Sequence, residues 1–204
     1  MPITSESVVT LHLLPATVRD RYECHEWRNG AAILREAHRA EWQDVIDMLD
    51  QFTLSKSWIV NPGGNKSKIA KWVDDFLTAR GWVEEGFETA ILVDQDRRDS
   101  PTHKVDCFKN SVGLEVEWNN KDPFYDRDLN NFRLLFELRV VEVGIMFTRC
   151  DNLQDIFDDL GRGSSYGMST THMSKLLPKI EGGGGGGCPL LVFGIPKSLY
   201  DPHS

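Results

Sequence analysis

Three acidic side chains stand in an otherwise apolar run at residues 105–121, VDCFKNSVGLEVEWNNK. Asp106 lies before a polar dipeptide, and Glu115 and Glu117 lie after it. Carboxylates at short spacing are ligands of hard divalent cations, and a further carboxylate beside such a cation can orient or deprotonate a water molecule. The residue types in this run therefore suit metal-assisted hydrolysis, provided that the chain folds so that they meet.

A strand and a tight turn would bring these acids together. The two-residue period of a strand puts both glutamates on one face. The opposite, apolar face then holds Val112, Leu114, Val116 and Trp118. If Asn110-Ser111 forms a hairpin turn, Asp106 faces Glu115. Facing Cβ atoms lie roughly 4.5–5.5 Å apart, where two carboxylates repel unless they share a proton or a cation.

Two interpretations follow from this spacing. In the first, Asp106 and Glu115 hold Mg²⁺, which takes one or two protein carboxylates and fills its other positions with water and phosphate. Glu117 then orients or deprotonates the attacking water, which is the chemistry of phosphodiester hydrolysis. In the second, the hairpin is exposed, its polar face is solvated, and Lys104, opposite Glu117, balances the charge.

The elements around this run combine helices and strands. The apolar period predicts helices over 39–52, 67–81, 127–138, 152–161 and 171–180, the last interrupted at Pro178. Ser67 suits the N-cap of the second helix, and Gly81 suits its left-handed C-terminal position. Strands are predicted over 87–94, 140–148 and 188–196, polar loops over 95–103 and 162–170, and a flexible surface loop over the six glycines of 182–187. This order indicates an α/β or α+β domain with a central sheet.

Composition is that of a globular protein and leaves nucleic-acid binding open. The 204 residues, 40% of them hydrophobic, suit one domain spanning 1–204, and no apolar run reaches the roughly 20 residues of a membrane span. The start, MPITSESVVTLHLL, lacks the pattern of a secretory signal, so a cytoplasmic location is expected. The net charge of −8 argues only mildly against nucleic acid, because a nuclease also needs carboxylates. Four scattered cysteines without CxxC spacing suit reduced, buried thiols better than a zinc or redox site.

The stretch DCFKNSVGLEVEW at 106–118 resembles the catalytic hairpin of the PD-(D/E)xK nucleases, in the form found in type II restriction endonucleases of the BglII/BstYI family. Similar stretches follow in the family's order along most of the chain: EWRNGAAILR (26–35), EWQDVIDML (41–49), ARGWVEE (79–85), GSSYG (163–167) and CPLLVFGIP (188–196). The resemblance implies an α/β fold with a central mixed β-sheet flanked by helices, a restriction-endonuclease-like core.

By this resemblance, Mg²⁺ is bound by Asp106, Glu115 and the backbone carbonyl of Val116. Position 117 departs from the superfamily, which has lysine there, and from the glutamine of BglII and BstYI. Glu117 instead resembles the Glu-x-Glu of the related BamHI. The departure leaves open whether Glu117 is the general base or only positions the attacking water.

Recognition of double-stranded DNA is the second implication. Asparagine suits adenine and lysine suits guanine in the major groove, and the candidates just after the catalytic strand are Asn119, Asn120 and Lys121. The family's second recognition loop corresponds to RGSSYG, with Arg162, Ser164 and Ser165 as candidates. In GGNKSK (63–68), backbone amides at a helix N-terminus could hold a phosphate together with Lys66 and Lys68. Each of these stretches is also typical of a plain solvated turn or loop.

A palindromic site read by two-fold symmetry implies a homodimer, with no membrane involved. The helix at 127–138 carries Leu134, Leu135 and Phe136 in succession, so one side could face the sheet and another a partner subunit, although burial in the monomer would also explain them. The family favours GATC-centred sites and cuts that leave 5′ overhangs. Two alternatives stay open: a structure- or repair-directed nuclease of the same fold, and a DNA-binding module whose acids are structural.

Overall fold

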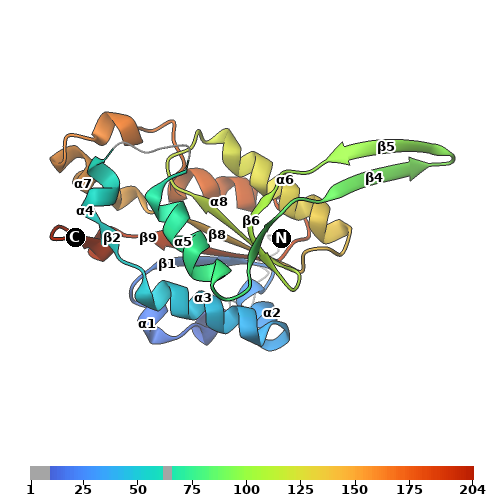
Figure 1. Cartoon of the computed structure of the whole chain (residues 1–204), viewed down its shortest axis with the longest axis horizontal. Coiled ribbons are helices and arrows are strands. Elements are labelled where there is room, and N and C mark those ends of the chain that lie inside the picture. Colours follow the sequence, from blue (N-terminus) through green and yellow to red (C-terminus); the bar gives the residue numbers. More distant parts are fainter. Residues whose placement is uncertain (1–9, 62–65) are drawn as a thin grey trace, which may run out of the picture.

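A mixed β-sheet of six strands crosses the protein, which the computed structural model describes over residues 10–61 and 66–204 (Figure 1). In spatial order the strands are β1 (Glu23–Trp27), β9 (Leu190–Ile195), β8 (Val143–Arg149), β7 (Val112–Glu117), β6 (Val105–Lys109) and β3 (Val83–Glu85). Strands β9, β8 and β7 run parallel, and the outer neighbours pair antiparallel. The expected α/β fold with a central mixed sheet is confirmed.

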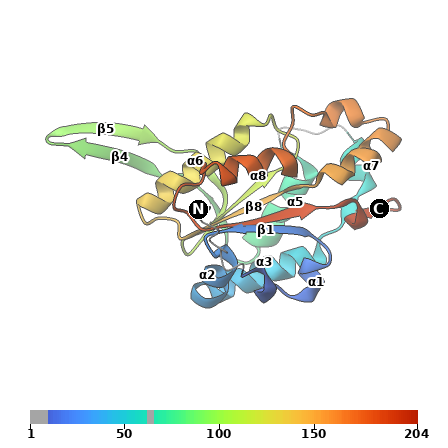
Figure 2. The same cartoon turned by 180° about the vertical axis from the view of Figure 1, so that it is seen from behind.

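Helices cover both faces of this sheet (Figures 1 and 2). One face packs against α1 (Ala16–Arg19), α2 (Gly30–Ala37), α3 (Arg39–Gln51), α4 (Lys56–Val60), α5 (Lys68–Thr78) and α7 (Gln154–Asp159). The other face packs against α6 (Pro123–Glu137) and α8 (Met173–Glu181). Short 3-10 turns are η1 (Leu11–Leu13), η2 (Asp151–Leu153), η3 (Gly163–Tyr166) and η4 (Lys197–Leu199), and β2 (Leu54–Ser55) pairs with β10 (Tyr200–Asp201). Within residues 10–61 and 66–204, no helix has the length and apolar character needed to cross a membrane.

The acidic run at residues 105–121 forms the predicted hairpin. Cys107 pairs with Leu114 and Lys109 with Val112, so the strands are in the expected register around the turn. The turn residues have φ angles of 45° and 66°, as a two-residue turn with both central residues in the left-handed region requires. The two faces of β7 also differ as predicted, because its even-numbered residues enter the core beneath α3 and α5.

Helix α6 sits on the other face of the sheet because two facing glycines make room for it. Gly113 of β7 pairs with Gly144 of β8 in the parallel ladder. A Cβ atom on either glycine would lie 2.8 Å from the ring of Phe132. The ring of Phe132 is fully buried, so it holds the middle of α6 directly over these two strands. This contact decides which residues of α6 lie beside the acids of β7.

Strands β4 (Glu88–Val93) and β5 (Asp96–Pro101) form a separate antiparallel hairpin that projects from the body (Figure 1), which we call the hairpin arm. The predicted strand at 87–94 is confirmed. The predicted polar loop at 95–103 is wrong, because β5 pairs with β4 along its length. The sequence of β5 is polar and lacks the alternation of apolar residues by which a strand is recognised. A two-stranded ribbon that projects from the body does not need this alternation, because it has no buried face. Ile91 and Leu92 are 54% and 72% exposed.

Two further expectations are corrected near the C-terminus, and one element begins earlier than expected. Pro178 lies inside α8 and does not interrupt it, since Leu176 and Ile180 on either side are buried against the sheet. The glycines of 182–187 form neither helix nor strand, as expected, but they are not simply a surface loop: Gly185 is buried, close to Leu190. Helix α6 begins at Pro123, not at 127, because proline suits the first helical turn.

Candidate active site

The acidic face of β7 is closed off from solvent. Glu115 and Glu117 are each 2% exposed. Lys104, which the alternative interpretation placed opposite Glu117, instead donates a 2.7 Å hydrogen bond to Glu84. The picture of a solvated outer face balanced by Lys104 is therefore wrong. The two glutamates are buried beneath α6, where a bare negative charge is costly.

Asp106 comes from β6 and meets β7 at its acidic end. Its Oδ2 accepts a 3.0 Å hydrogen bond from the backbone N–H of Val116, next to Glu115. Burial, followed by the charges of Asp128 and Asp106, raises the pKa of Glu115 well above its ordinary value. One oxygen of Glu115, Oε1, is buried and has no hydrogen-bond partner. Asp106 and Glu115 thus come together as predicted, where two carboxylates repel unless they share a proton or a cation.

Glu117 has more partners than Glu115. Its Oε2 accepts a 2.9 Å hydrogen bond from Asn120, and its Oε1 lies 3.4 Å from Nη2 of Arg127. It also shares a hydrogen bond with Asp128. Burial, then the charge of Asp128, raises the pKa of Glu117 to about 9. At neutral pH the metal-free protein therefore keeps a proton on Glu117, which donates it in the hydrogen bond to Asp128.

Arg127 and Asp128 are site residues that the sequence analysis did not identify. Both lie in α6, and Arg127 donates to Oδ1 of Asp128 from Nε at 2.8 Å. Asp128 is fully buried and lies one turn before Phe132 on the side of α6 that faces the sheet. An acid at this position of an apolar stripe is a signal that the sequence does contain, since buried acids need partners.

The donors at the end of the hairpin fit a hard cation. In the described part of the chain, no three His, Cys, Asp or Glu side chains are arranged to hold a metal ion. The candidate metal ligands are instead two carboxylates and a backbone carbonyl, those of Asp106, Glu115 and Val116, all of them oxygen donors. Such a set suits Mg²⁺, which commonly uses one or two carboxylates and completes its shell with water. The unpartnered buried oxygen of Glu115 is the kind of atom that such a cation would satisfy.

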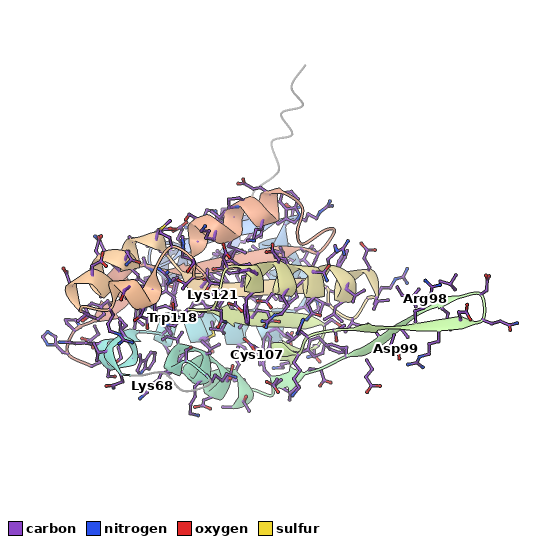
Figure 3. The ribbon with its side chains drawn as sticks, turned by 90° about the horizontal axis from the view of Figure 1, so that it is seen from above. Lys68, Arg98, Asp99, Cys107, Trp118 and Lys121 are labelled. Carbon is purple, nitrogen blue, oxygen red and sulfur yellow. The ribbon has the colours of Figure 1, made fainter. Side chains whose placement is uncertain are left out.

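A cleft of about 480 Å³ opens above these residues. Asp106, Val116 and Glu117 line it, whereas Glu115 is buried and is not part of the lining. Its rim includes five of the eight predicted DNA-binding residues: Lys66, Lys68, Asn119, Asn120 and Arg162. Figure 3 shows Lys68, Trp118 and Lys121 on the half of the molecule away from the hairpin arm.

The other candidates lie outside the lining of this cleft. Lys121 forms an isolated backbone bridge with Thr170. Ser164 and Ser165 are exposed on η3, whose Tyr166 stacks on Phe157 with ring centroids 4.0 Å apart.

Two of the five predicted DNA-binding residues in the lining already have protein partners. Lys66 pairs with Asp74, and Asn120 is bonded to Glu117. Ser67 caps α5, as predicted, by accepting a hydrogen bond from the N–H of Ala70. Residues 63–65, whose amides were expected to hold a phosphate, lie outside the described residues, as do residues 1–9 of the N-terminal stretch.

A known protein family matches most of this chain. A family model described as restriction endonuclease BglII/BglIII matches residues 22–195 of the 204. The matched region contains the whole six-stranded sheet, including the β6–β7 hairpin, and α6. A comparison with curated proteins gives no significant match. With most of its length matched, the chain belongs to the BglII/BglIII family of restriction endonucleases.

Proposed function

We propose that this protein is a type II restriction endonuclease that hydrolyses phosphodiester bonds of duplex DNA at a short palindrome, with Mg²⁺ as cofactor. The family supports a nuclease that acts on DNA. The observation that carries the finer proposal is the meeting of Asp106 with the buried Glu115 at a cleft whose rim is basic and amide-rich. A single domain over 1–204 would act as one half of a homodimer in the cytoplasm.

Different residues of the chain would bind the cation and orient the attacking water. Asp106, Glu115 and the carbonyl of Val116 would hold the cation, which when bound neutralises phosphate charge and polarises the bond that breaks. Glu117 lines the cleft beside them and is the residue placed to orient the attacking water. It accepts a proton only once its own has left, because its pKa in the metal-free protein is about 9. Positive charge held by its neighbours would favour that ionised form.

Base recognition is proposed for the rim of the cleft and the loops beside it. Asn119 is exposed on this rim and suits adenine, and Lys121 follows it and suits guanine. Asn120 must give up its bond to Glu117 before it can contact a base. Arg162, Ser164, Ser165 and the lysines Lys66 and Lys68 are assigned to further base or phosphate contacts. A GATC-centred site and 5′ overhangs complete the proposal.

The homodimer is proposed to form through α6. Leu135 is buried, as a residue facing the sheet must be. Leu134 is half-buried, and Leu138, one helical turn later on the same side, is 45% exposed, whereas Phe136 packs against the core. This side of the helix is available for a second copy, which a palindromic site requires.

Digestion of plasmid and phage DNA in Mg²⁺ buffer, with an EDTA control and sequencing of the ends, tests the proposal. Discrete fragments that end at one palindrome, and that disappear with EDTA, are expected. Fragments without fixed ends would indicate a structure- or repair-directed nuclease instead. Binding that ignores metal, without any cleavage, would make the acids structural. Sedimentation of the free protein measures the dimer independently.

A further inference from the structure

Four carboxyl groups meet at the end of the β6–β7 hairpin: Asp106 from β6, Glu115 and Glu117 from β7, and Asp128 from α6. The charges of Asp128 and Asp106 raise the pKa of Glu115 beyond the effect of burial, and the charge of Asp128 does the same for Glu117. Strand β7 itself holds no lysine or arginine. A phosphodiester entering the cleft brings another negative charge to this group. Repulsion between like charges in a partly buried site is strong, so the site needs a positive side chain in addition to a bound cation.

Arg127 is the guanidinium within this group. Its Nη2 lies 3.4 Å from Oε1 of Glu117 and 2.7 Å from Oδ1 of Asp128, and its Nε lies 2.8 Å from the same Asp128 oxygen. The face of Phe124 lies 4.4 Å from its central carbon. The side chain is 32% exposed and lines the cleft with Asp106 and Glu117.

Arg127 is held in place by the sheet, not by solvent-exposed contacts alone. Asp128 anchors two of its nitrogens, and Asp128 is fixed one turn from Phe132, which is seated on the paired glycines of β7 and β8. The third nitrogen, Nη1, takes part in none of these contacts. A planar guanidinium anchored on one edge presents its remaining N–H groups in the fork that matches a phosphate.

The other cations of the cleft lack this link to the acids. Lys66 is paired with Asp74 of α5, on the other side of the cleft. Lys68 and Arg162 line the rim, where they can reach phosphates along the DNA backbone. Among the cations lining the cleft, Arg127 is the one in contact with Glu117. It is therefore the cation nearest to the phosphodiester bond at which Glu117 would orient the attacking water.

We propose that Arg127 contacts the scissile phosphate and stabilises the negative charge that develops on it, with Asp128 as the residue that positions the guanidinium. This inference rests on the nuclease function proposed above. Electrostatic groups held in place before the reaction stabilise developing charge without reorganisation. The step itself is unchanged: water attacks phosphorus, the P–O bond to the leaving oxygen breaks, and that oxygen takes a proton.

A double-mutant cycle between the side chain and the phosphate tests the contact directly. The cut position is first mapped by sequencing wild-type products. Duplexes carrying either the natural phosphate or an uncharged methylphosphonate at that bond are then titrated, in EDTA, with wild-type protein and with Arg127→Gln. The variant is expected to weaken binding of the natural duplex roughly 10- to 100-fold more than binding of the methylphosphonate duplex. It is also expected to slow single-turnover cleavage of the natural duplex.

Arg35→Ala, an exposed arginine of α2, is the matched control and should show a coupling factor near one. If Arg127→Gln fails to fold, Arg127→Lys takes its place and should show the same coupling with a smaller factor, because a point charge replaces the fork. An equal loss on both duplexes, or no loss on either, would overturn the proposal, because a structural role does not depend on the charge of one phosphate. A wild-type protein that cuts no DNA would overturn the proposed function itself, and a protein that cuts without coupling would overturn this inference alone.

Discussion

Glu117 connects three neighbours that differ in charge. An amide, a guanidinium and a second carboxylic acid all contact one carboxyl group that is almost completely buried. The arrangement keeps a proton on Glu117 and leaves the negative charge on Asp128, where Arg127 offsets it. In the metal-free protein a bound proton therefore neutralises part of the negative charge of these acids. Because this proton is bound in the folded state, the stability of the protein depends on pH.

The free energy of unfolding of the metal-free protein should fall as pH rises between about 5 and 9. The pKa of Glu117 is about 9 in the folded protein, against an ordinary value of 4.5, so the folded form holds a proton that the unfolded chain releases across this window. The stabilisation is complete below the lower pKa and is lost as pH rises through the higher one. Urea unfolding in EDTA across this range measures it. Glu117→Gln should make the curve shallower, with Glu115 contributing the remaining dependence, and Glu88→Gln on the hairpin arm should leave it unchanged.

Asp106→Asn should lower cleavage by roughly 1000-fold or more, because the loss of a metal-binding carboxylate removes several kcal/mol of transition-state stabilisation. DNA binding in EDTA should stay the same or tighten, since one negative charge beside the phosphate has gone. Cleavage assays and binding titrations on the same preparation measure both. Asp99→Asn, an exposed acid of the hairpin arm, is the control. Near-normal cutting by the Asp106 variant would remove this residue from the proposed metal site.

At the scale of elements, the contact between α6 and the sheet determines whether the site can form. Phe132 fits over Gly113 and Gly144 because neither has a side chain, and the same turn of helix brings Asp128 beside Glu117. Geometry at the acids thus depends on two glycines that carry no chemistry of their own.

Gly144→Ala should destabilise the protein by about 1–3 kcal/mol, the usual cost of inserting a methyl group into a filled core. The new Cβ would lie 2.8 Å from both Phe132 and Leu190, so α6 must shift. Cleavage should fall further than stability alone explains, because Arg127 and Asp128 move with the helix. Urea unfolding and single-turnover rates measure the two effects. The control is Ala32→Gly on α2, which exchanges the same two residue types away from the site. Gly183→Ala is unsuitable as a control because the φ angle of Gly183 is positive.

Local patterns predicted the elements that local forces shape. The hairpin turn at 110–111, the cap at Ser67 and the faces of β7 follow from residue types a few positions apart. Asp106 and Glu115 could be predicted for the same reason. Arg127 could not, because its role depends on how α6 lies on the sheet, a contact between segments that periodicity does not specify. For Asp128 the sequence shows an acid within an apolar stripe, but not the partners that it meets. Strand β5 was missed because only pairing with β4 makes it a strand.

At the scale of the whole molecule, the hairpin arm differs from the rest of the fold. Its strands pair with each other and form their own two-stranded sheet (Figure 1). Ile91, Leu92 and Val93 are about half exposed or more, so they contribute little burial to the core. The six-stranded sheet and its helices should therefore fold without the arm.

Replacing residues 89–100 by a short turn should shift the thermal unfolding midpoint of the dilute protein by less than about 2 °C, the size expected for a change well under 1 kcal/mol in a domain of this length. Phe87 stays in place because its ring contacts Phe108 of β6, with centroids 5.1 Å apart. Calorimetry measures the midpoint. A fall of 10 °C or so would show that the arm carries stability that its exposed surface does not reveal.

The two-residue turn at Asn110 and Ser111 has a consequence for how this enzyme can diverge. Side chains alternate along a strand, so one residue inserted into or deleted from β6 beyond the turn would slip the pairing by one position. Asp106 would then point to the apolar face, away from Glu115. Substitutions can accumulate in the hairpin while its length stays constant, and gaps should fall elsewhere, for example in the hairpin arm. In an alignment of descendants of this gene, the segment from Asp106 to Glu117 should be a block without gaps.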